Sequence, residues 1–262
     1  LYQDLNFKIS LPTKGNGKWT VFGLGGISEI DLLGSEADLS SDTDLYGDEN
    51  TDTYPRYKTG ILGVAYEKSI SPKTSLKLTG GVSYTFESFT GDSLVRNSEN
   101  EVVDKYQRFD SEFTTAKYSI TGITRTKFNS KNSLTSGFYI DYLNFDLYNR
   151  DIYANLGRDS VRVDVQDNTT LYQAYSTWKH RFNSKFLFNA GLHAQYYSLN
   201  EQFSVEPRLG FQYVINGRHS VSAGFGLHNQ IQSIYTSFVQ TEIANNTVLL
   251  TNTDLDYTTS RH

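Results

Sequence analysis

Hydrophobic and polar residues alternate along most of this chain with a period of two. In the segment 75–87, for example, Leu76, Val82 and Phe86 share one face and polar side chains fill the other. The same alternation recurs at 5–11, 186–197, 205–215 and 220–230, and more weakly at 19–31, 56–70, 112–128, 133–147 and 170–182. The pattern predicts ten β-strands, with an eleventh beginning within Asp254–His262.

The predicted connections alternate in length. Short polar turns fall at 12–18, 71–74, 129–132, 183–185 and 216–219. Long connections fall near 32–54, 88–110, 148–168 and 231–252, with one short exception at 200–201. Short turns at one end and long loops at the other are typical of an antiparallel up-and-down sheet with two chemically different ends.

Strand length favours a transmembrane barrel over a soluble sandwich. The alternating runs reach about 11 to 15 residues, whereas sandwich strands usually have about 5 to 6 and a tilted bilayer crossing needs about 9 to 11. In a barrel the apolar set faces lipid, and polar residues such as Lys77, Glu87 and Gln212 face an enclosed wet interior. Aromatic residues near the strand ends would form the interfacial girdles: Tyr2, Trp19, Phe86, Phe89, Tyr118, Tyr142, Trp178, Tyr196 and Tyr213.

Composition removes several other classes of protein. The 262 residues are 37% hydrophobic and 14% aromatic, and they include no Cys. Thiol nucleophiles and Cys-ligated metal sites are therefore excluded, and the longest apolar run, 61–65, is too short for a membrane helix. The net charge of −5 comes with no basic stripe, so nucleic acid is not an expected partner.

Several segments resemble the barrel of Bacteroidota-type TonB-dependent outer-membrane receptors. They are AGLHAQY at 190–196, EPRLGFQY at 206–213 and HSVSAGFGLHNQ at 219–230, with weaker likeness in YQDLNFK at 2–8 and FGLGGIS at 22–28. The resemblance implies a barrel of about 22 strands, an N-terminal plug inside it and a segment that engages the TonB complex.

The chain departs from a whole receptor of that family. It contains no recognisable plug, no coupling box and no aromatic C-terminal residue, and its 10 to 11 predicted strands are about half of such a barrel. We therefore expect residues 1–262 to be part of a single barrel domain, with the plug and the remaining strands outside this chain. A half barrel leaves two open strand edges, which hydrocarbon does not tolerate, so the remaining chain or a partner must close it.

Two groups of residues are candidate sites. The candidates for facing the lumen or the plug are His193, Gln195, Glu206, Arg208, Gln212, His228 and Gln230, and Glu206 and Arg208 are placed to form an ion pair there. The expected extracellular acidic loop contains Asp42, Asp44, Asp48, Glu49 and Asp52. It resembles a calcium loop only in part, because Thr53 stands where a bidentate Glu is needed, so a solvated loop is favoured. The five His residues lack the further ligands of a metal site.

The resemblance implies a receptor barrel in the bacterial outer membrane that takes part in energy-coupled nutrient uptake. No catalytic residue, metal or cofactor is expected. The expected partners are outer-membrane lipid and lipopolysaccharide, the TonB complex through the N-terminal part outside this chain, and a surface lipoprotein. Two alternatives stay open: a non-transporting surface barrel that anchors or docks a partner protein, and a soluble carbohydrate-binding β-sandwich.

Overall fold

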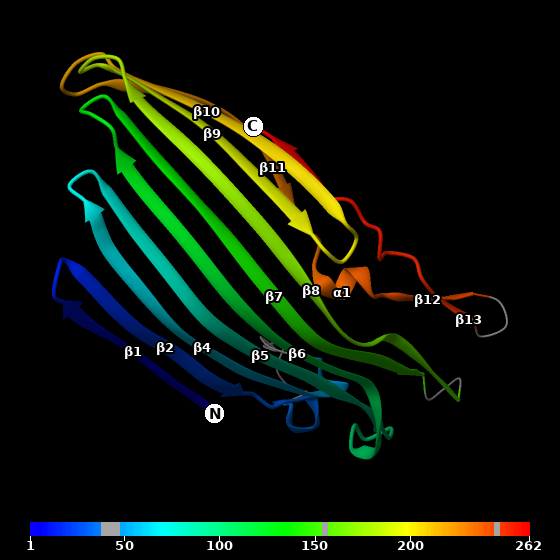
Figure 1. The fold of residues 1–262 in the computed structure, drawn as a ribbon. Coiled ribbons are helices and arrows are strands. Elements are labelled where there is room, and N and C mark those ends of the chain that lie inside the picture. The colour runs from blue at the N-terminus through cyan, green and yellow to red at the C-terminus, as the bar shows by residue number, and fades with distance from the viewer. Residues whose placement is uncertain (38–47, 154–156, 244–246) are drawn as a thin grey trace.

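The chain forms a large antiparallel sheet that curves like part of a barrel wall (Figure 1). The computed structural model describes residues 1–37, 48–153, 157–243 and 247–262. In sheet order the main strands are β1 (Tyr2–Thr13), β2 (Gly17–Glu29), β4 (Thr51–Ser71), β5 (Thr74–Arg96), β6 (Val102–Lys127), β7 (Asn132–Tyr153), β8 (Arg158–Arg181), β9 (Phe186–Tyr197), β10 (Gln202–Val214), β11 (Ser220–Gln230) and β14 (Thr258–Arg261). Each pairs antiparallel with the next, so the predicted up-and-down sheet is confirmed.

Smaller elements lie at the end of the sheet opposite the short turns. The strand β3 (Leu32–Leu33) pairs with β4 and leads into the 3-10 turn η1 (Gly34–Glu36). The short helix α1 (Ile234–Ser237) precedes β12 (Gln240–Ile243) and β13 (Thr247–Leu250), which pair with each other. Across the described ranges, no helix combines the length and hydrophobicity needed to cross a bilayer.

The strands at the centre of the sheet are much longer than predicted. β5 continues to Arg96 and β6 begins at Val102, while β7 continues to Tyr153 and β8 begins at Arg158. The prediction of long connections at 88–110 and 148–168 is therefore wrong. Where both faces of a strand meet water, the strand can continue without the alternation of hydrophobic and polar residues that marks its other part.

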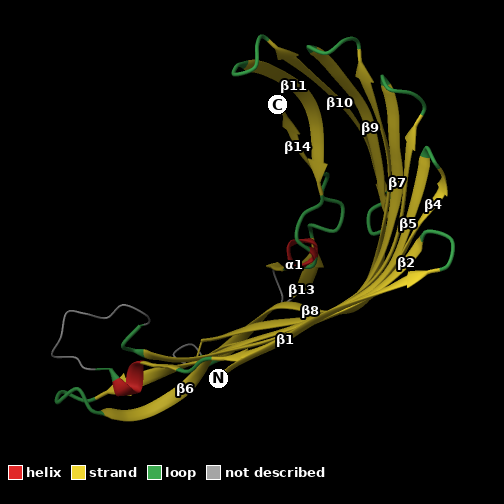
Figure 2. Cartoon of the chain, turned by 90° about the vertical axis from the view of Figure 1, so that its left-hand side faces the viewer, coloured by secondary structure: helices red, strands yellow, loops and turns green. Residues whose placement is uncertain are grey.

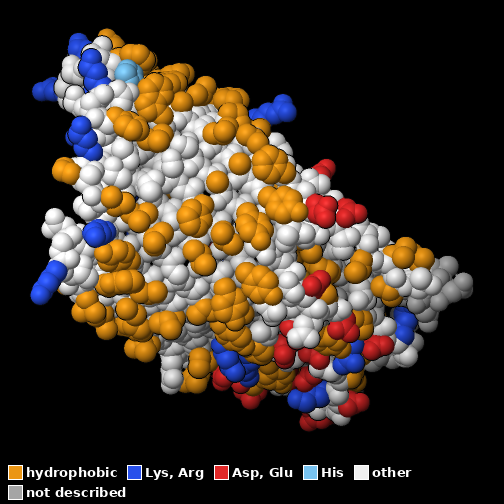
Figure 3. Space-filling model, in the orientation of Figure 1, with side chains coloured by type: hydrophobic (Ala, Val, Ile, Leu, Met, Phe, Trp, Pro, Cys, Tyr) orange, Lys and Arg blue, Asp and Glu red, His pale blue; other side chains and the backbone are white. Residues whose placement is uncertain are grey.

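The two faces of the sheet differ in chemistry. Large hydrophobic residues lie exposed on the convex face, and Ile120, for example, is 58% exposed. The strand register continues this face across the sheet, since Leu62 pairs with Val82 and Val82 with Tyr118. Figure 3 shows hydrophobic side chains spread over this face. No second sheet covers it in the described structure, so the β-sandwich alternative does not describe this fold.

Aromatic side chains form two belts on the convex face. One lies near the short turns and includes Trp19, Trp178 and Tyr213; the other includes Tyr118, Tyr142, Tyr196 and Phe203. On β10, Phe203 and Tyr213 lie ten positions apart, or about 34 Å along the strand. At a tilt of about 40° this gives a height of about 26 Å, which matches the apolar band of outer-membrane barrels. Phe89 was predicted to join a girdle, but it lies on the concave face and stacks on Phe109.

The concave face carries the apolar core of the described structure. Phe145, Leu147 and Val163 are buried there under Phe238, which follows α1. Figure 2 shows α1 inside the curve of the sheet. The segment between β11 and β12 therefore returns into the concave side instead of remaining outside the sheet.

Candidate functional site

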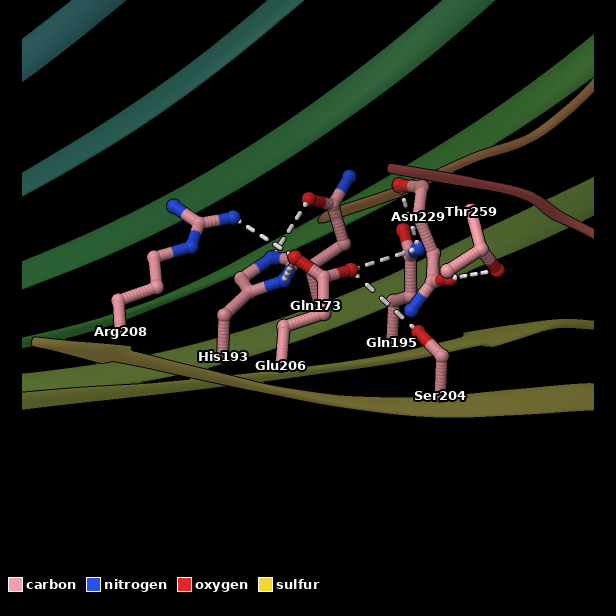
Figure 4. A network of polar contacts seen from close by, with 8 residues as sticks. All are labelled: Gln173, His193, Gln195, Ser204, Glu206, Arg208, Asn229 and Thr259. Carbon is pink, nitrogen blue, oxygen red and sulfur yellow. Dashed lines mark hydrogen bonds and ion pairs between the residues drawn. The ribbon is translucent and has the colours of Figure 1, made fainter. Parts of the chain in front are cut away.

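A cluster of polar side chains occupies the concave face where β8, β9 and β10 lie together (Figure 4). Glu206 on β10 lies opposite His193 on β9. Gln195 lies opposite Ser204 on one side and Gln173 on the other. Because side chains alternate between the faces of a strand, this register places all five on one face. We call these residues, with Arg208 and Asn229, the polar network.

Glu206 is the centre of the polar network and is only 1% exposed. Its Oε2 lies 2.7 Å from Nη2 of Arg208, so the ion pair expected from the i, i+2 spacing is present. Its Oε1 accepts hydrogen bonds from Nε2 of Gln195 at 3.1 Å and from Oγ of Ser204 at 3.4 Å. An ionised carboxylate is costly to bury without such partners, so the network must form as a unit.

His193 connects Glu206 to the neighbouring strand β8. Its Nδ1 lies 3.1 Å from Oε2 of Glu206, which is an ion-pair distance without the direction of a hydrogen bond. Its Nε2 lies 3.2 Å from Oε1 of Gln173. On the other side, Gln195 donates to the carbonyl of Asn229 at 3.0 Å and so connects the network to β11.

The polar network borders a hollow of about 530 Å³ that opens toward the inside of the curve. Arg208 lies at its edge with a side chain that is 45% exposed, in contrast to the buried Glu206. Gly191 lies opposite Arg208, and a Cβ there would approach Oγ1 of Thr177 to 3.2 Å. The absence of a side chain at Gly191 therefore keeps the floor of the hollow open. The accessible charged group of this hollow is a guanidinium.

The predicted lumen-facing residues divide into two groups. His193, Gln195, Glu206 and Arg208 meet in the polar network, and His228 lines the same hollow. Gln212 and Gln230 share the concave face but make no hydrogen bond within the network. Gln173, Ser204 and Asn229 also belong to the network but were not among the predicted residues. The predicted strand began at 205, whereas β10 begins at Gln202, so Ser204 was placed outside the strand.

In the described part of the acidic loop, Asp48 and Asp52 accept hydrogen bonds from neighbouring residues of the chain. Asp42 and Asp44 lie outside the described residues. Asp52 is buried, and its carboxylate accepts from the N–H of Ser35 at 2.9 Å and from its Oγ at 3.0 Å. Asp48 accepts from the N–H of Asn50, and this hydrogen bond is the main cause of a lowered pKa for the Asp48 carboxyl. In the described ranges, no group of three or more His, Cys, Asp or Glu could hold a metal ion.

A second hollow, of about 690 Å³, lies where the central strands extend past the convex apolar band. Its wall includes Phe89 and Phe109, whose rings stack with centroids 4.9 Å apart. Arg108 and Tyr106 are exposed beside them. Aromatic faces with a nearby cation offer a surface for planar or anionic ligands.

Comparison with known proteins finds similarity in solved structures alone. Neither a protein-family model nor a curated protein sequence matches the chain. The siderophore receptor PirA from Acinetobacter baumannii aligns with a TM-score of 0.64 and 15% identity over 99% of this chain and 39% of its own. The RagAB peptide importer aligns with a TM-score of 0.62 and 11% identity, over 98% and 36%. A variant of the ferric enterobactin receptor PfeA from Pseudomonas aeruginosa aligns with a TM-score of 0.53 and 10% identity, over 99% and 47%.

The chain has the fold of a TonB-dependent receptor barrel. It spans less than half the length of each of these receptors. The receptor-barrel fold accounts for the curved sheet, since the described strands correspond to part of a closed wall. The polar network lies on the concave face of this sheet, and the aromatic belts lie on its convex face.

Proposed function

We propose that this chain forms part of the barrel of a bacterial outer-membrane receptor that imports a nutrient with energy delivered through TonB. The observation that carries the proposal is the convex face, where exposed hydrophobic residues continue from strand to strand between two aromatic belts. Such a face suits the hydrocarbon of a bilayer. The plug and the other strands belong to the remainder of the protein, with residues 1–262 as part of one barrel domain.

In this proposal the two hollows have different tasks. The hollow beside Arg208 meets the plug, whose carboxylates or backbone carbonyls would accept hydrogen bonds from the guanidinium. His228, Gln212 and Gln230 extend this plug-facing surface along the concave face. The hollow beside Phe109 meets the incoming ligand, because it lies at the end away from the short turns. The chain acts as a scaffold and makes or breaks no covalent bond.

Membrane insertion can be tested with single cysteines, because this chain has none of its own. In the full-length receptor, kept free of other cysteines, we would place one at Ser98, Ser130 or Ile120. A membrane-impermeant maleimide should label S98C on intact cells and S130C only after the outer membrane is permeabilised. I120C should react only with a lipophilic maleimide. Labelling of I120C by the impermeant reagent on intact cells would contradict the proposal.

Transport is tested by uptake of two kinds of nutrient, a ferric siderophore and a peptide, because the similar structures include a ferric enterobactin receptor and a peptide importer. Cells carrying the full-length receptor would be given iron-55 enterobactin or a labelled oligopeptide mixture. We expect accumulation of one of them, and its loss when tonB is deleted or the proton gradient is dissipated. A receptor that accumulates neither but co-purifies with a surface lipoprotein would support the docking alternative instead.

A further inference from the structure

The short-turn end of the sheet carries a regular series of cations. The five turns at this end each contain one Lys or Arg and no Asp or Glu: Lys14, Lys73, Lys131, Lys185 and Arg218. All five are exposed, and none makes an ion pair within the described structure. We call these five residues the basic rim. Figure 3 shows Lys and Arg side chains at this end and acidic side chains gathered toward the other.

Local turn chemistry fixes the position of the cation. The carboxamide oxygen of Asn129 accepts from the N–H of Lys131 at 2.9 Å, and Asn183 and Asn216 do the same two residues before Lys185 and Arg218. Ser71 accepts from the N–H of Lys73 in the same way. Side chains that bond to the backbone two residues ahead give a defined turn. Four of the five cations therefore occupy equivalent places, and successive turns lie two strands, or about 10 Å, apart.

The aromatic belt beside the rim indicates its depth. Trp19 lies on the convex face three residues after the first turn, and its ring centroid lies 4.6 Å from that of Tyr66. Trp178 lies three residues before β8 ends, with Phe188 beside it. Trp and Tyr occupy the level of the lipid headgroups at the edge of hydrocarbon. Lys14 lies three residues past Leu11, the partner of Trp19, and Lys131 lies three residues past Leu134, the partner of Trp178. The rim cations therefore lie on the headgroup side of this belt, toward the phosphates.

We infer that the basic rim binds the headgroups of anionic phospholipids in the leaflet that meets the short turns. The inference depends on the membrane insertion proposed above, but not on transport. In outer-membrane barrels the short turns are periplasmic, so this leaflet is made of phospholipid. Each Lys or Arg near an anionic surface strengthens attraction roughly five-fold, and the rim presents five with no acidic residue among them.

The two Trp residues of this chain serve as reporters, because both lie in the belt next to the rim. The full-length receptor would be reconstituted in phosphatidylethanolamine bilayers containing either brominated phosphatidylglycerol or brominated phosphatidylethanolamine with the same chains. The fluorescence of a W19F/W178F receptor, subtracted under each condition, isolates the signal of Trp19 and Trp178. We expect phosphatidylglycerol to quench at least about three-fold more strongly per lipid, and 1 M NaCl to reduce the difference.

Variants that remove positive charge test whether the basic rim causes the preference for phosphatidylglycerol. Changing all five rim residues to Gln should bring the quenching ratio of the two lipids close to one. A control receptor with Gln at five cations of the concave face should keep the original ratio while losing the same charge; these are Lys8, Lys77, Lys117, Lys127 and Lys179. Equal quenching by both lipids in the unmodified receptor would overturn the rim proposal alone. The same result is expected if the rim binds an acidic protein and not lipid. Absence of quenching by either lipid would overturn membrane insertion as well.

Discussion

Two regions of the concave face, the polar network and the apolar cluster around Phe145, are buried by different kinds of contact. In the polar network, the carboxylate of Glu206 is enclosed by donors from its own strand β10 and from the neighbouring strand β9. In the apolar cluster on β7 and β8, Phe145, Leu147 and Val163 are covered by Phe238 from the returning segment after β11. The first region is closed by strand pairing and the second by a segment that is distant in sequence.

The comparison shows that alternation assigns a face but not the chemistry of that face. Phe145 and Glu206 both lie on the concave face. Phe145 is buried by hydrophobic side chains, whereas Glu206 is buried by an ion pair and hydrogen bonds. Apolar burial on this side removes area from water and stabilises by about 25 cal/mol per Å². In the proposed bilayer the convex face would gain little from that source, because lipid chains are as apolar as the side chains themselves.

The largest effect is expected from F145A. Phe145 is 0% exposed, so the substitution leaves a cavity and should lower the free energy of unfolding by about 3–5 kcal/mol. Urea titration of the full-length receptor in lipid vesicles measures this. I120A on the convex face is the matched control and should cost less than about 1 kcal/mol. Equal losses would mean that the two faces do not differ in the way described.

A slightly smaller and more local effect is expected from F238A. The rings of Phe238 and Phe145 lie with centroids 5.3 Å apart, and this contact holds the returning segment. Without it, hydrogen exchange of the backbone at 233–240 should accelerate at least about ten-fold, while the long strands stay protected. V248A, at an exposed position of β13, provides the comparison and should leave exchange at 233–240 unchanged.

E206A tests the polar network and should cost about 2–3 kcal/mol. The substitution leaves the donors of Gln195 and Ser204 without their acceptor, and Arg208 keeps partial access to water, which limits the loss. Q212A removes a polar residue from the same face of β10 outside the network, and its effect should stay within about 0.5 kcal/mol. If the polar network did not stabilise the fold, E206A and Q212A would lower the free energy of unfolding by equal amounts.

Much of the sheet could be predicted from the sequence, because its convex face is apolar and its concave face is largely polar. The alternation is strict around Leu76–Phe86, and in Phe186–Tyr197 it is interrupted only at Leu187 and Tyr197. The extensions of β5 and β6 beyond Phe89 could not be predicted in this way, since water meets both of their faces and β-branched, aromatic and charged residues mix freely. Phe89 itself was assigned to the wrong face because aromatic content was used in place of register.

The candidate site was predictable only where it followed the alternation. Glu206, Arg208, His193 and Gln195 share a face by counting, and their contacts follow from pairing β9 with β10. The cover over Phe145 depends on where the 231–239 segment returns, and this segment has no periodicity that fixes its path. Asp52 was predicted as a solvated acid, but it became buried because the backbone of Ser35 reaches it from a distant turn.

The smallest effect concerns the exposed end of the acidic loop. The pKa of Asp48 is lowered chiefly by the N–H of Asn50, with further contributions from the hydroxyl of Thr51 and the charge of Arg108. A carboxyl whose pKa is lower when folded stabilises the fold above its unfolded pKa, and this stabilisation is lost as pH falls through the folded value.

D48N should therefore be less stable than the unmodified receptor at pH 7, by no more than about 0.5 kcal/mol because Asp48 is exposed. The difference should shrink as pH falls from 5 toward 2, which paired urea titrations across that range can measure. E49Q changes the neighbouring carboxylate, which makes no side-chain hydrogen bond among the described residues, and should show no such trend. A difference between D48N and the unmodified receptor that stays constant with pH would assign the effect to the shape of the side chain instead of its charge.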